Sequence, residues 1–153
     1  MSVEPGIVDA NILAYAMNAD APHHAASRAL LEEARDPSTT LYVTSQVLCE
    51  FYSLITNPRR VAAPCSPTEA LGIISALLAL PGVYVLPSPV GAVTGWMELL
   101  ERHPVTGGDV FDLQLVATMK ANNVERIYTF NTEDFEVFPD LAVLIPRAQT
   151  SST

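Results

Sequence analysis

The segment Ile7-Val8-Asp9-Ala10-Asn11-Ile12-Leu13 joins a short apolar run to an acidic residue and then to an apolar helical pattern. This order is typical of a buried strand that leads directly into a helix. A second apolar run, residues 127–130, ends in the same way at Asn131. The carboxyl ends of parallel strands meet at one edge of a sheet, where open α/β folds bind ligands. We therefore expect Asp9 and Asn131 to lie at one ligand-binding edge.

The rest of the chain alternates short apolar runs with longer helical patterns. Strands are predicted at residues 7–8, 41–44, 83–86, 126–130 and 142–145. Helices are predicted through residues 11–15, 22–35, 45–56, 67–80, 89–102 and 109–119. Ser45, Ser66 and Asp109 are expected to be the N-caps of three of them. Continuous apolar strands that alternate with helices predict an α/β protein, a three-layer α/β/α sandwich with a mostly parallel central sheet.

Two further carboxylates fall within helices rather than at strand ends. Glu50 lies beside Val47 and Leu54, at the margin of the apolar stripe of the helix at 45–56. Asp112 lies inside a stripe, because its neighbours at i+3, i+4 and i+7 are all apolar. A buried carboxylate is costly unless a cation or hydrogen-bond donors compensate it, and no Lys or Arg stands one turn from Asp112.

Each acidic residue also has an ordinary structural interpretation. Asp9 is as well placed to cap a helix as to bind a ligand, and Glu50 is able to pair with an arginine. Asp112, in mid-stripe, has no capping role. As a set, Asp9, Glu50, Asp112 and the pair Asn131/Asp134 form a candidate metal site, because the fold would bring them to one edge.

The composition indicates one domain with a partner. A chain of 153 residues fits a single domain, which we place at residues 1–148, followed by a polar tail at 149–153. A hydrophobic content of 49% with only 16% charged residues indicates apolar surface that a second subunit or a partner covers. The net charge of −9 argues against a protein that clamps nucleic acid through a broad positive surface. Arg59-Arg60, Lys120 and Arg126 are either steering residues or solvated helix ends.

Other features predict a soluble, cytoplasmic protein. No apolar run reaches the roughly 18 residues that span a bilayer, and the N-terminus lacks a signal-peptide pattern. Cys49 and Cys65 lack the close-spaced partners of a zinc site and are read as reduced thiols. The histidines at 23, 24 and 103 are read as surface or first-turn residues.

The order and spacing of four blocks resemble a known family. The blocks are Val8-Asp9-Ala10-Asn11-Ile12-Leu13, the helix with Glu50, residues 111–119 with Asp112, and residues 129–135 with Asn131 and Asp134. Together they look like PIN-domain proteins, specifically VapC-type toxin ribonucleases of bacterial toxin–antitoxin pairs. The chain departs from the pattern at Asn131, where many relatives carry Asp, and at Phe111, where close relatives often carry His.

This resemblance implies a metal-dependent endoribonuclease. By it, Asp9, Glu50 and Asp112 correspond to the family's metal-binding acids, while either Asn131 or Asp134 completes the set. It implies Mg²⁺ or Mn²⁺ as the cofactor, RNA as the substrate, a VapB-like antitoxin as the partner and a homodimer as the assembly. The number of metal ions, one or two, stays open. Mg²⁺ favours oxygen ligands and activates a bound water, so the reaction needs no Ser, Cys or His nucleophile.

Three alternatives remain. A haloacid-dehalogenase-like phosphatase would carry a second Asp two residues after Asp9, where Asn11 stands. A response-regulator receiver domain would carry paired acids after the first strand, which are missing. A catalytically inactive PIN domain that only binds RNA or protein is expected to lack Asp9, Glu50 or Asp112, and all of them are present.

Overall fold

The computed structural model describes residues 3–148 of the chain. The polar tail predicted at 149–153 lies outside these residues. The secondary structure, in chain order, is β1 (Gly6–Val8), α1 (Ala10–Ala16), α2 (His24–Glu33), β2 (Leu41–Thr44), α3 (Ser45–Thr56), α4 (Pro67–Leu78), β3 (Val83–Leu86), α5 (Gly91–Arg102), η1 (Gly107–Asp109), α6 (Val110–Ala121), β4 (Arg126–Tyr128), η2 (Thr132–Asp134) and β5 (Ala142–Leu144).

Five parallel strands form one sheet in the order β3-β2-β1-β4-β5. The earliest strand, β1, therefore lies at the centre, between β2 and β4. The chain first adds β2 and β3 on one side of β1 and then returns to add β4 and β5 on the other. Open α/β sheets bind ligands where the strand order reverses in this way. The predicted parallel sheet is confirmed, and its reversal point lies between β1 and β4.

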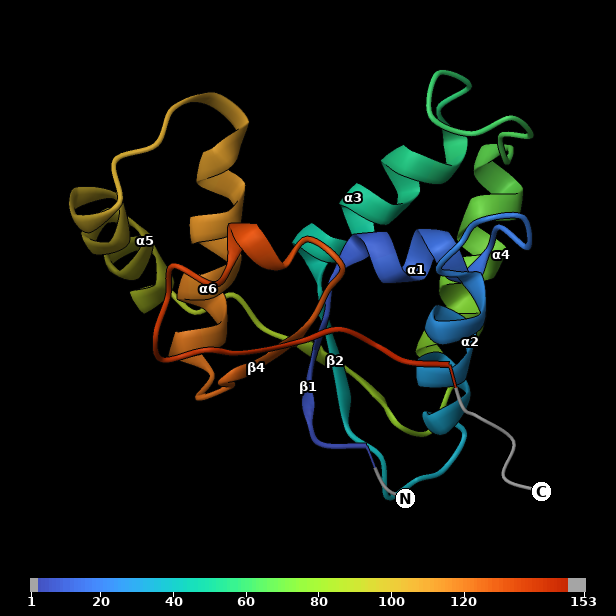
Figure 1. Ribbon diagram of the computed structural model, residues 1–153, viewed down its shortest axis with the longest axis horizontal. Helices are drawn as coiled ribbons and strands as arrows, with labels where there is room; N and C mark the ends of the chain where they lie inside the picture. The colour runs from blue at the N-terminus through green and yellow to red at the C-terminus, as the bar shows by residue number, and fades with distance from the viewer. Residues whose placement is uncertain (1–2, 149–153) are drawn as a thin grey trace.

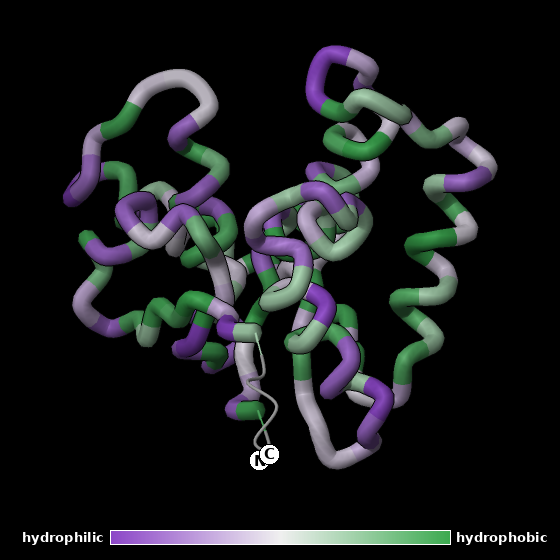
Figure 2. Tube along the Cα trace, turned by 45° about the vertical axis from the view of Figure 1, so that its right-hand side comes forward, coloured by the Kyte–Doolittle hydropathy of each residue, from purple (hydrophilic) through white to green (hydrophobic). Residues whose placement is uncertain are grey.

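Helices cover both faces of the sheet. Figure 1 shows α1 to α4 on one side and α5 with α6 on the other, which confirms the three-layer α/β/α sandwich. Polar and apolar residues alternate along the helices of both outer layers (Figure 2), as expected when one side of each helix packs on the core. Within the described residues, no helix has the length and hydropathy that crossing a membrane requires.

The central strands β1, β2 and β4 are largely buried because helices cover both of their faces. All of β1 is buried, and Leu41, Val43 and Ile127 of the neighbouring strands are at most 1% exposed. Continuous apolar runs are the sequence signature of such strands. This burial holds the carboxyl ends of β1 and β4 in a fixed position.

Two of the three predicted N-caps are wrong. Thr44, not Ser45, caps α3, because its extended backbone lets Oγ1 accept the Val47 N–H at 3.1 Å. Asp109 precedes α6 with helical φ and ψ of −65° and −18°, and its side chain makes no capping hydrogen bond. A capping residue needs an extended backbone, which η1 denies to Asp109. Ser66 is confirmed and forms a full capping box with Glu69.

Several element ends also differ from the prediction. The helix predicted at 22–35 begins at His24, because the preceding residues form a turn in which the His24 N–H donates to Ala21 O at 3.1 Å. The helices predicted at 67–80 and 89–102 are α4 and α5, each two residues shorter at one end. The strand predicted at 126–130 ends at Tyr128, because the Phe130 N–H turns to the Asn11 Oδ1 at 3.5 Å. The last strand ends at Leu144 rather than at residue 145.

Gly82 occupies a tight backbone junction that supports β3. Its N–H donates to Ala34 O at 2.7 Å, and its carbonyl accepts the Leu41 N–H at 2.8 Å. A Cβ at this position would lie 2.9 Å from backbone atoms of Ala34 and Thr39. Gly72, within α4, has open space at the same point.

We predict opposite effects of alanine at these two glycines. Gly82→Ala should lower the free energy of unfolding by about 1–3 kcal/mol, because the backbone must move to admit the methyl group. Gly72→Ala should raise it by about 0.5–1 kcal/mol, because alanine loses less conformational entropy in a helix. Urea unfolding curves of the two variants measure the difference. Equal unfolding midpoints would contradict the packing at Gly82.

Candidate functional site

The site is built at the carboxyl ends of β1 and β4. Val8 pairs with Tyr128 in the sheet, so the next residues of the two strands, Asp9 and Thr129, become neighbours. The Asp9 N–H donates to Tyr128 O at 3.0 Å and extends the pairing by one step. The acidic residue that follows β1 is thereby positioned at the reversal point of the sheet.

Asp9 is buried, with 8% of its surface exposed. One carboxylate oxygen accepts the Ala10 N–H at 2.8 Å, and the other accepts the Thr129 hydroxyl at 2.8 Å. Burial raises the pKa of Asp9 above its ordinary value of 3.8, while the hydrogen bonds from Thr129 and Ala10 lower it and the charges of Glu50 and Asp134 raise it. The capping and the ligand-site interpretations of Asp9 are therefore compatible, because the cap uses only one of its oxygens.

Asn11 and Thr129 hold this carboxylate in place. The Asn11 amide donates to the second Asp9 oxygen at 3.4 Å and to Thr129 Oγ1 at 3.3 Å. The same hydroxyl oxygen accepts the Asn131 N–H at 3.0 Å. These bonds join the end of β1 to the loop after β4 and orient Asp9.

Asp112 is half-buried near the start of α6, and its charge is the most strongly perturbed at the site. Burial raises the pKa of Asp112 from 3.8 to about 7, and the charges of Asp134, Asp9, Glu50 and Asp109 raise it in the same direction. Four carboxylates from other parts of the chain are thus close enough to act on Asp112. Its predicted place inside an apolar stripe is confirmed by the burial of Leu115, Val116 and Met119 on the same helix.

Glu50 belongs to the same set but is exposed. Its position at the margin of the α3 stripe directs it to solvent. Gln46, one turn earlier, donates to Glu50 Oε1 at 3.1 Å. The charge of Glu50 nevertheless raises the pKa of both Asp9 and Asp112. Glu50 therefore contributes charge to the site while keeping its hydration.

The structure distinguishes Asp134 from Asn131. Asp134, in η2, is exposed, and its charge acts on both Asp9 and Asp112. Within residues 3–148, Asn131 forms hydrogen bonds through its backbone, which donates to Thr129 Oγ1 and accepts the Asp134 N–H. Of the two alternatives left open by the sequence, Asp134 is thus the one that adds negative charge at the acidic edge.

Sequence analysis missed the supporting residues Thr129 and Gln46. Thr129 stands directly after β4 as Asp9 stands after β1, and this parallel position was the available signal. The position of Thr129 indicates a role beside Asp9 only when β4 is known to lie next to β1 in the sheet. Gln46 precedes Glu50 by one helical turn, which is the spacing at which side chains on a helix meet.

The donor set suits a hard divalent cation. Asp9, Glu50, Asp112 and Asp134 offer only oxygen ligands, and none forms an ion pair with a basic side chain within residues 3–148. Within that range, no group of three or more His, Cys, Asp or Glu side chains is arranged so that its members could coordinate one metal ion together. Mg²⁺ needs fewer protein ligands than three, because it keeps several bound waters and is held by one or two carboxylates. The unneutralised charge around Asp112 fits such an ion.

The basic residues lie mostly away from this edge. Arg126 contacts Glu4 at 3.3 Å and Pro5 O at 2.6 Å, at the amino end of β4. Lys120 pairs with Asp140 at 3.5 Å. Arg59 and Arg60, in the turn after α3, are exposed and form no ion pair within the described residues. The latter two are therefore the better candidates for steering a polyanion.

Comparison with known proteins agrees with this arrangement. The family model of the PIN domain matches residues 6–141. Ribonuclease VapC43 of Mycobacterium tuberculosis is 34% identical over 116 residues, which cover 76% of this chain and 79% of that protein. Ribonuclease VapC24 of the same species is 29% identical over 131 residues, covering 86% and 89%.

Solved structures share the fold at lower identity. The M. tuberculosis toxin VapC20, which cleaves the sarcin-ricin loop, superposes with a TM-score of 0.65 at 21% identity, covering 86% of this chain and 94% of that one. VapBC2 from Rickettsia felis, bound to a fragment of its promoter DNA, gives a TM-score of 0.67 at 19% identity and covers 94% and 100%. With a family match over most of its length and a relative at 34% identity, the chain belongs to the PIN domain family and, within it, to the VapC ribonucleases.

Proposed function

We propose that this protein is a metal-dependent endoribonuclease that cleaves RNA phosphodiester bonds and is the toxin of a VapBC-type toxin–antitoxin pair. The observation that carries the proposal is Asp112. Its pKa is raised to about 7 by burial and by the charges of four further carboxylates, none of which has a basic counterion in residues 3–148. A cation is the simplest group that would compensate this charge. The names of the relatives, ribonucleases of the VapC type, support the same activity.

In this proposal Asp9, Glu50, Asp112 and Asp134 are the groups that hold Mg²⁺ or Mn²⁺. When bound, such an ion supplies an activated water and offsets the negative charge that develops on the phosphate. Asp9 is oriented by the Thr129 hydroxyl and by the Ala10 N–H, so one of its oxygen faces is presented in a fixed direction. Asn131 acts on the site through its backbone contact with Thr129.

A catalytically inactive PIN domain is the second candidate. It would explain the fold and the family match, but it would not need a cluster of carboxylates in which burial and neighbouring negative charges raise the pKa of Asp9 and Asp112. Such a cluster is costly without a ligand, and it is retained here. The enzymatic proposal therefore accounts for more of the structure.

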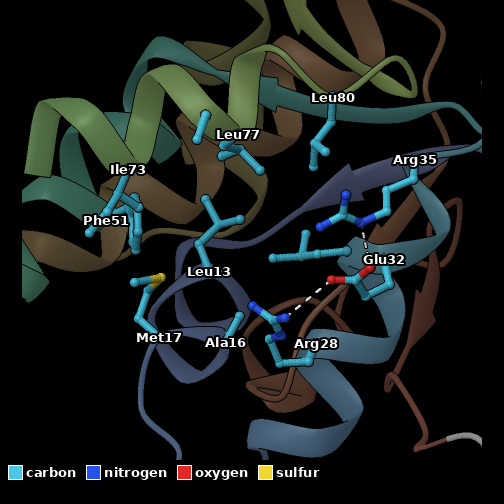
Figure 3. A pocket seen from close by; sticks show the side chains of 12 residues that line it. Leu13, Ala16, Met17, Arg28, Glu32, Arg35, Phe51, Ile73, Leu77 and Leu80 are labelled. Carbon is cyan, nitrogen blue, oxygen red and sulfur yellow. Dashed lines mark hydrogen bonds and ion pairs between the residues drawn. The ribbon is translucent and has the colours of Figure 1, made fainter.

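The antitoxin partner fits an apolar groove between α1, α2, α3 and α4. Figure 3 shows Leu13, Phe51 and Leu77 lining this groove of about 290 Å³. Its polar rim carries Arg28 and Arg35, both paired with Glu32, at 3.2 and 2.5 Å. Two cations against one anion leave a positive rim. An amphipathic helix with apolar anchors and an acidic residue beside them would match both the groove and its rim.

The remaining expectations become proposals of the same kind. We place the nuclease function in one domain at residues 1–148, in the cytoplasm, where the RNA and the antitoxin are made. A homodimer would cover apolar side chains that this chain exposes, such as Val85 on β3 and Val93 and Met97 on α5, which are 54%, 51% and 54% exposed.

Loss of single carboxylates should abolish cleavage. We expect Asp9→Asn and Asp112→Asn each to reduce cleavage of RNA in Mg²⁺ below detection, with the fold retained by circular dichroism. Asp134→Asn should lower activity and Asn131→Ala should lower it less, because only Asp134 adds charge to the site. Cleavage that survives in both Asp9→Asn and Asp112→Asn, or that persists in excess chelator, would refute a metal-dependent nuclease.

The charge at Asp112 also predicts a pH-dependent stability. In the unfolded chain its pKa is 3.8 and in the folded protein about 7, so between these values the folded state binds more protons. Stability of the metal-free protein should therefore fall as the pH rises through this range. Asp112→Asn removes this fall, so its melting temperature in chelator should exceed that of the wild type at roughly pH 8 and approach it at roughly pH 4.

Metal and a second variant complete this experiment. Mg²⁺ at a hundredfold excess over its dissociation constant should stabilise the wild type by about 2.7 kcal/mol and the variant much less. Glu50→Gln should raise the melting temperature less than Asp112→Asn, because Glu50 is exposed. This explanation is wrong if Mg²⁺ does not change the melting temperature of the wild type and if both variants have a lower melting temperature than the wild type in chelator.

Binding of the antitoxin should be separable from cleavage. Ala76 is exposed on α4 and lines the groove, whereas the adjacent Ser75 is exposed and does not line it. Ala76→Glu should weaken binding of the antitoxin encoded beside this gene by about tenfold or more, because a buried carboxylate must be desolvated. Ser75→Glu is the matched control and should bind normally. Calorimetric titration measures both, and equal affinities would place the antitoxin elsewhere.

A further inference from the structure

A second cavity adjoins the acidic edge and differs from it in chemistry. This cleft, of about 510 Å³, lies between the first turns of α3, the end of β3 and one face of α6. Glu50 forms part of its wall and so connects it to the candidate metal site. The other polar side chains that line it are neutral hydroxyl, amide and thiol groups: Thr44, Ser45, Gln46, Cys49, Ser88, Gln114 and Thr118.

The orientation of the Gln46 amide is determined by its neighbours. Its Nε2 donates to Glu50 Oε1 at 3.1 Å and to the carbonyl oxygen of Phe111 at 2.8 Å. Both partners are acceptors only, so the NH₂ group must face them and the amide oxygen must point elsewhere. Within the described residues this oxygen accepts no hydrogen bond and is not sealed from solvent. Gln46 therefore presents a fixed acceptor at the cleft.

Phe111 presents a flat apolar surface beside this acceptor. The residue lines the cleft, is 54% exposed, and its backbone carbonyl anchors Gln46. A ring that is more than half exposed at the wall of a cleft contributes little to packing in the core. Rings in this position provide a stacking surface for unpaired bases in many RNA-binding proteins.

We propose that this cleft is a base-binding subsite, which receives one unpaired nucleobase next to the phosphodiester bond that is cleaved. The inference rests on the proposed ribonuclease function and adds a specificity-determining residue to it. A phosphate would not suit the cleft, because no cation lines it and Glu50 would repel the anion. A neutral base suits it, stacked on Phe111 with its edge toward Gln46.

The fixed acceptor selects among bases. Adenine, cytosine and guanine carry an exocyclic amine that is able to donate to the Gln46 oxygen. Uracil has only its ring N3–H as a donor on this edge, and the two carbonyl oxygens beside it repel an approaching acceptor. The cleft should therefore favour an amine-bearing base over uracil at one position beside the scissile bond. One hydrogen bond of this kind discriminates by about fivefold.

The first test reads the base preference of cleavage. Wild-type protein in Mg²⁺ is given a pool of short single-stranded RNAs with all bases at each position, and the fragments are sequenced. Gln46→Met keeps the side-chain length but has no amide, and it should lose the roughly fivefold preference against uracil at that one position. Turnover is also expected to fall, because Gln46 contacts Glu50, but a purely structural role would not change the preference.

Phe111→Ala tests the stacking surface. It should raise KM by about tenfold with a smaller effect on kcat, which is the size expected for one lost base–aromatic stack. Tyr84→Ala is the matched control, because Tyr84 is 46% exposed and lies outside the cleft. The proposal is overturned if Gln46→Met cleaves with the wild-type preference, or if Phe111→Ala and Tyr84→Ala have the same KM.

The second test detects occupancy of the cleft directly. Cys49 is an exposed thiol of the cleft wall, and Cys65 is a thiol outside it. In the Asp112→Asn variant, which should bind RNA without cutting it, a single-stranded RNA should slow alkylation of Cys49 by N-ethylmaleimide and leave that of Cys65 unchanged. RNA that binds, as measured by fluorescence anisotropy, without protecting Cys49 would refute the subsite.

The subsite and the ribonuclease function are refuted by different results. A wild type that cleaves RNA without any base preference beside the scissile bond would overturn the subsite and leave the ribonuclease intact. A wild type that cleaves no RNA in Mg²⁺ or Mn²⁺ would overturn the proposed function and the subsite with it.

Discussion

Burial of carboxylates beside one another governs the functional edge of this protein. Asp9, Glu50, Asp112 and Asp134 come from separate parts of the chain, burial and the neighbouring charges raise the pKa of Asp9 and Asp112, and no basic side chain of residues 3–148 pairs with the four. Such an arrangement opposes folding unless rigid elements impose it. The parallel sheet supplies that rigidity, because β1 is buried on both faces and is flanked by strands on both sides. The acidic edge therefore depends on the core beneath it.

Hydrogen bonds at the reversal point of the sheet then set the direction of each group. Thr129 reaches Asp9 across a separation of 120 residues, and Asn11 contacts both of them. A carboxylate held in this way keeps one orientation whether or not a cation is near. Preorganisation of this kind lowers the cost of assembling a site at the moment of binding.

Helix α3 is shared by three surfaces of the molecule. Glu50 faces the acidic edge, Gln46 and Cys49 face the polar cleft, and Phe51 lines the apolar groove on the other side. An occupant of the groove would thus pack against the same helix that presents Glu50 to the substrate. A partner bound in the groove would contact Phe51, which is adjacent to Glu50 in α3. Inhibition by such a partner therefore needs no conformational change that is transmitted over a long distance.

Local patterns in the chain were sufficient to predict the strands at 41–44 and 83–86, the N-cap Ser66 and the three-layer class. They also singled out Asp9 and Asp112, because a carboxylate after a buried strand or within an apolar stripe is unusual wherever it occurs. They did not reveal that Thr44 replaces Ser45 as a cap, that Asp109 is helical, that Glu50 is exposed or that Thr129 supports Asp9. Hydropathy and turn chemistry act over a few residues and can be read along the chain. Strand order, side-chain exposure and contacts between residues far apart depend on how the elements pack, so they emerged only from the folded arrangement.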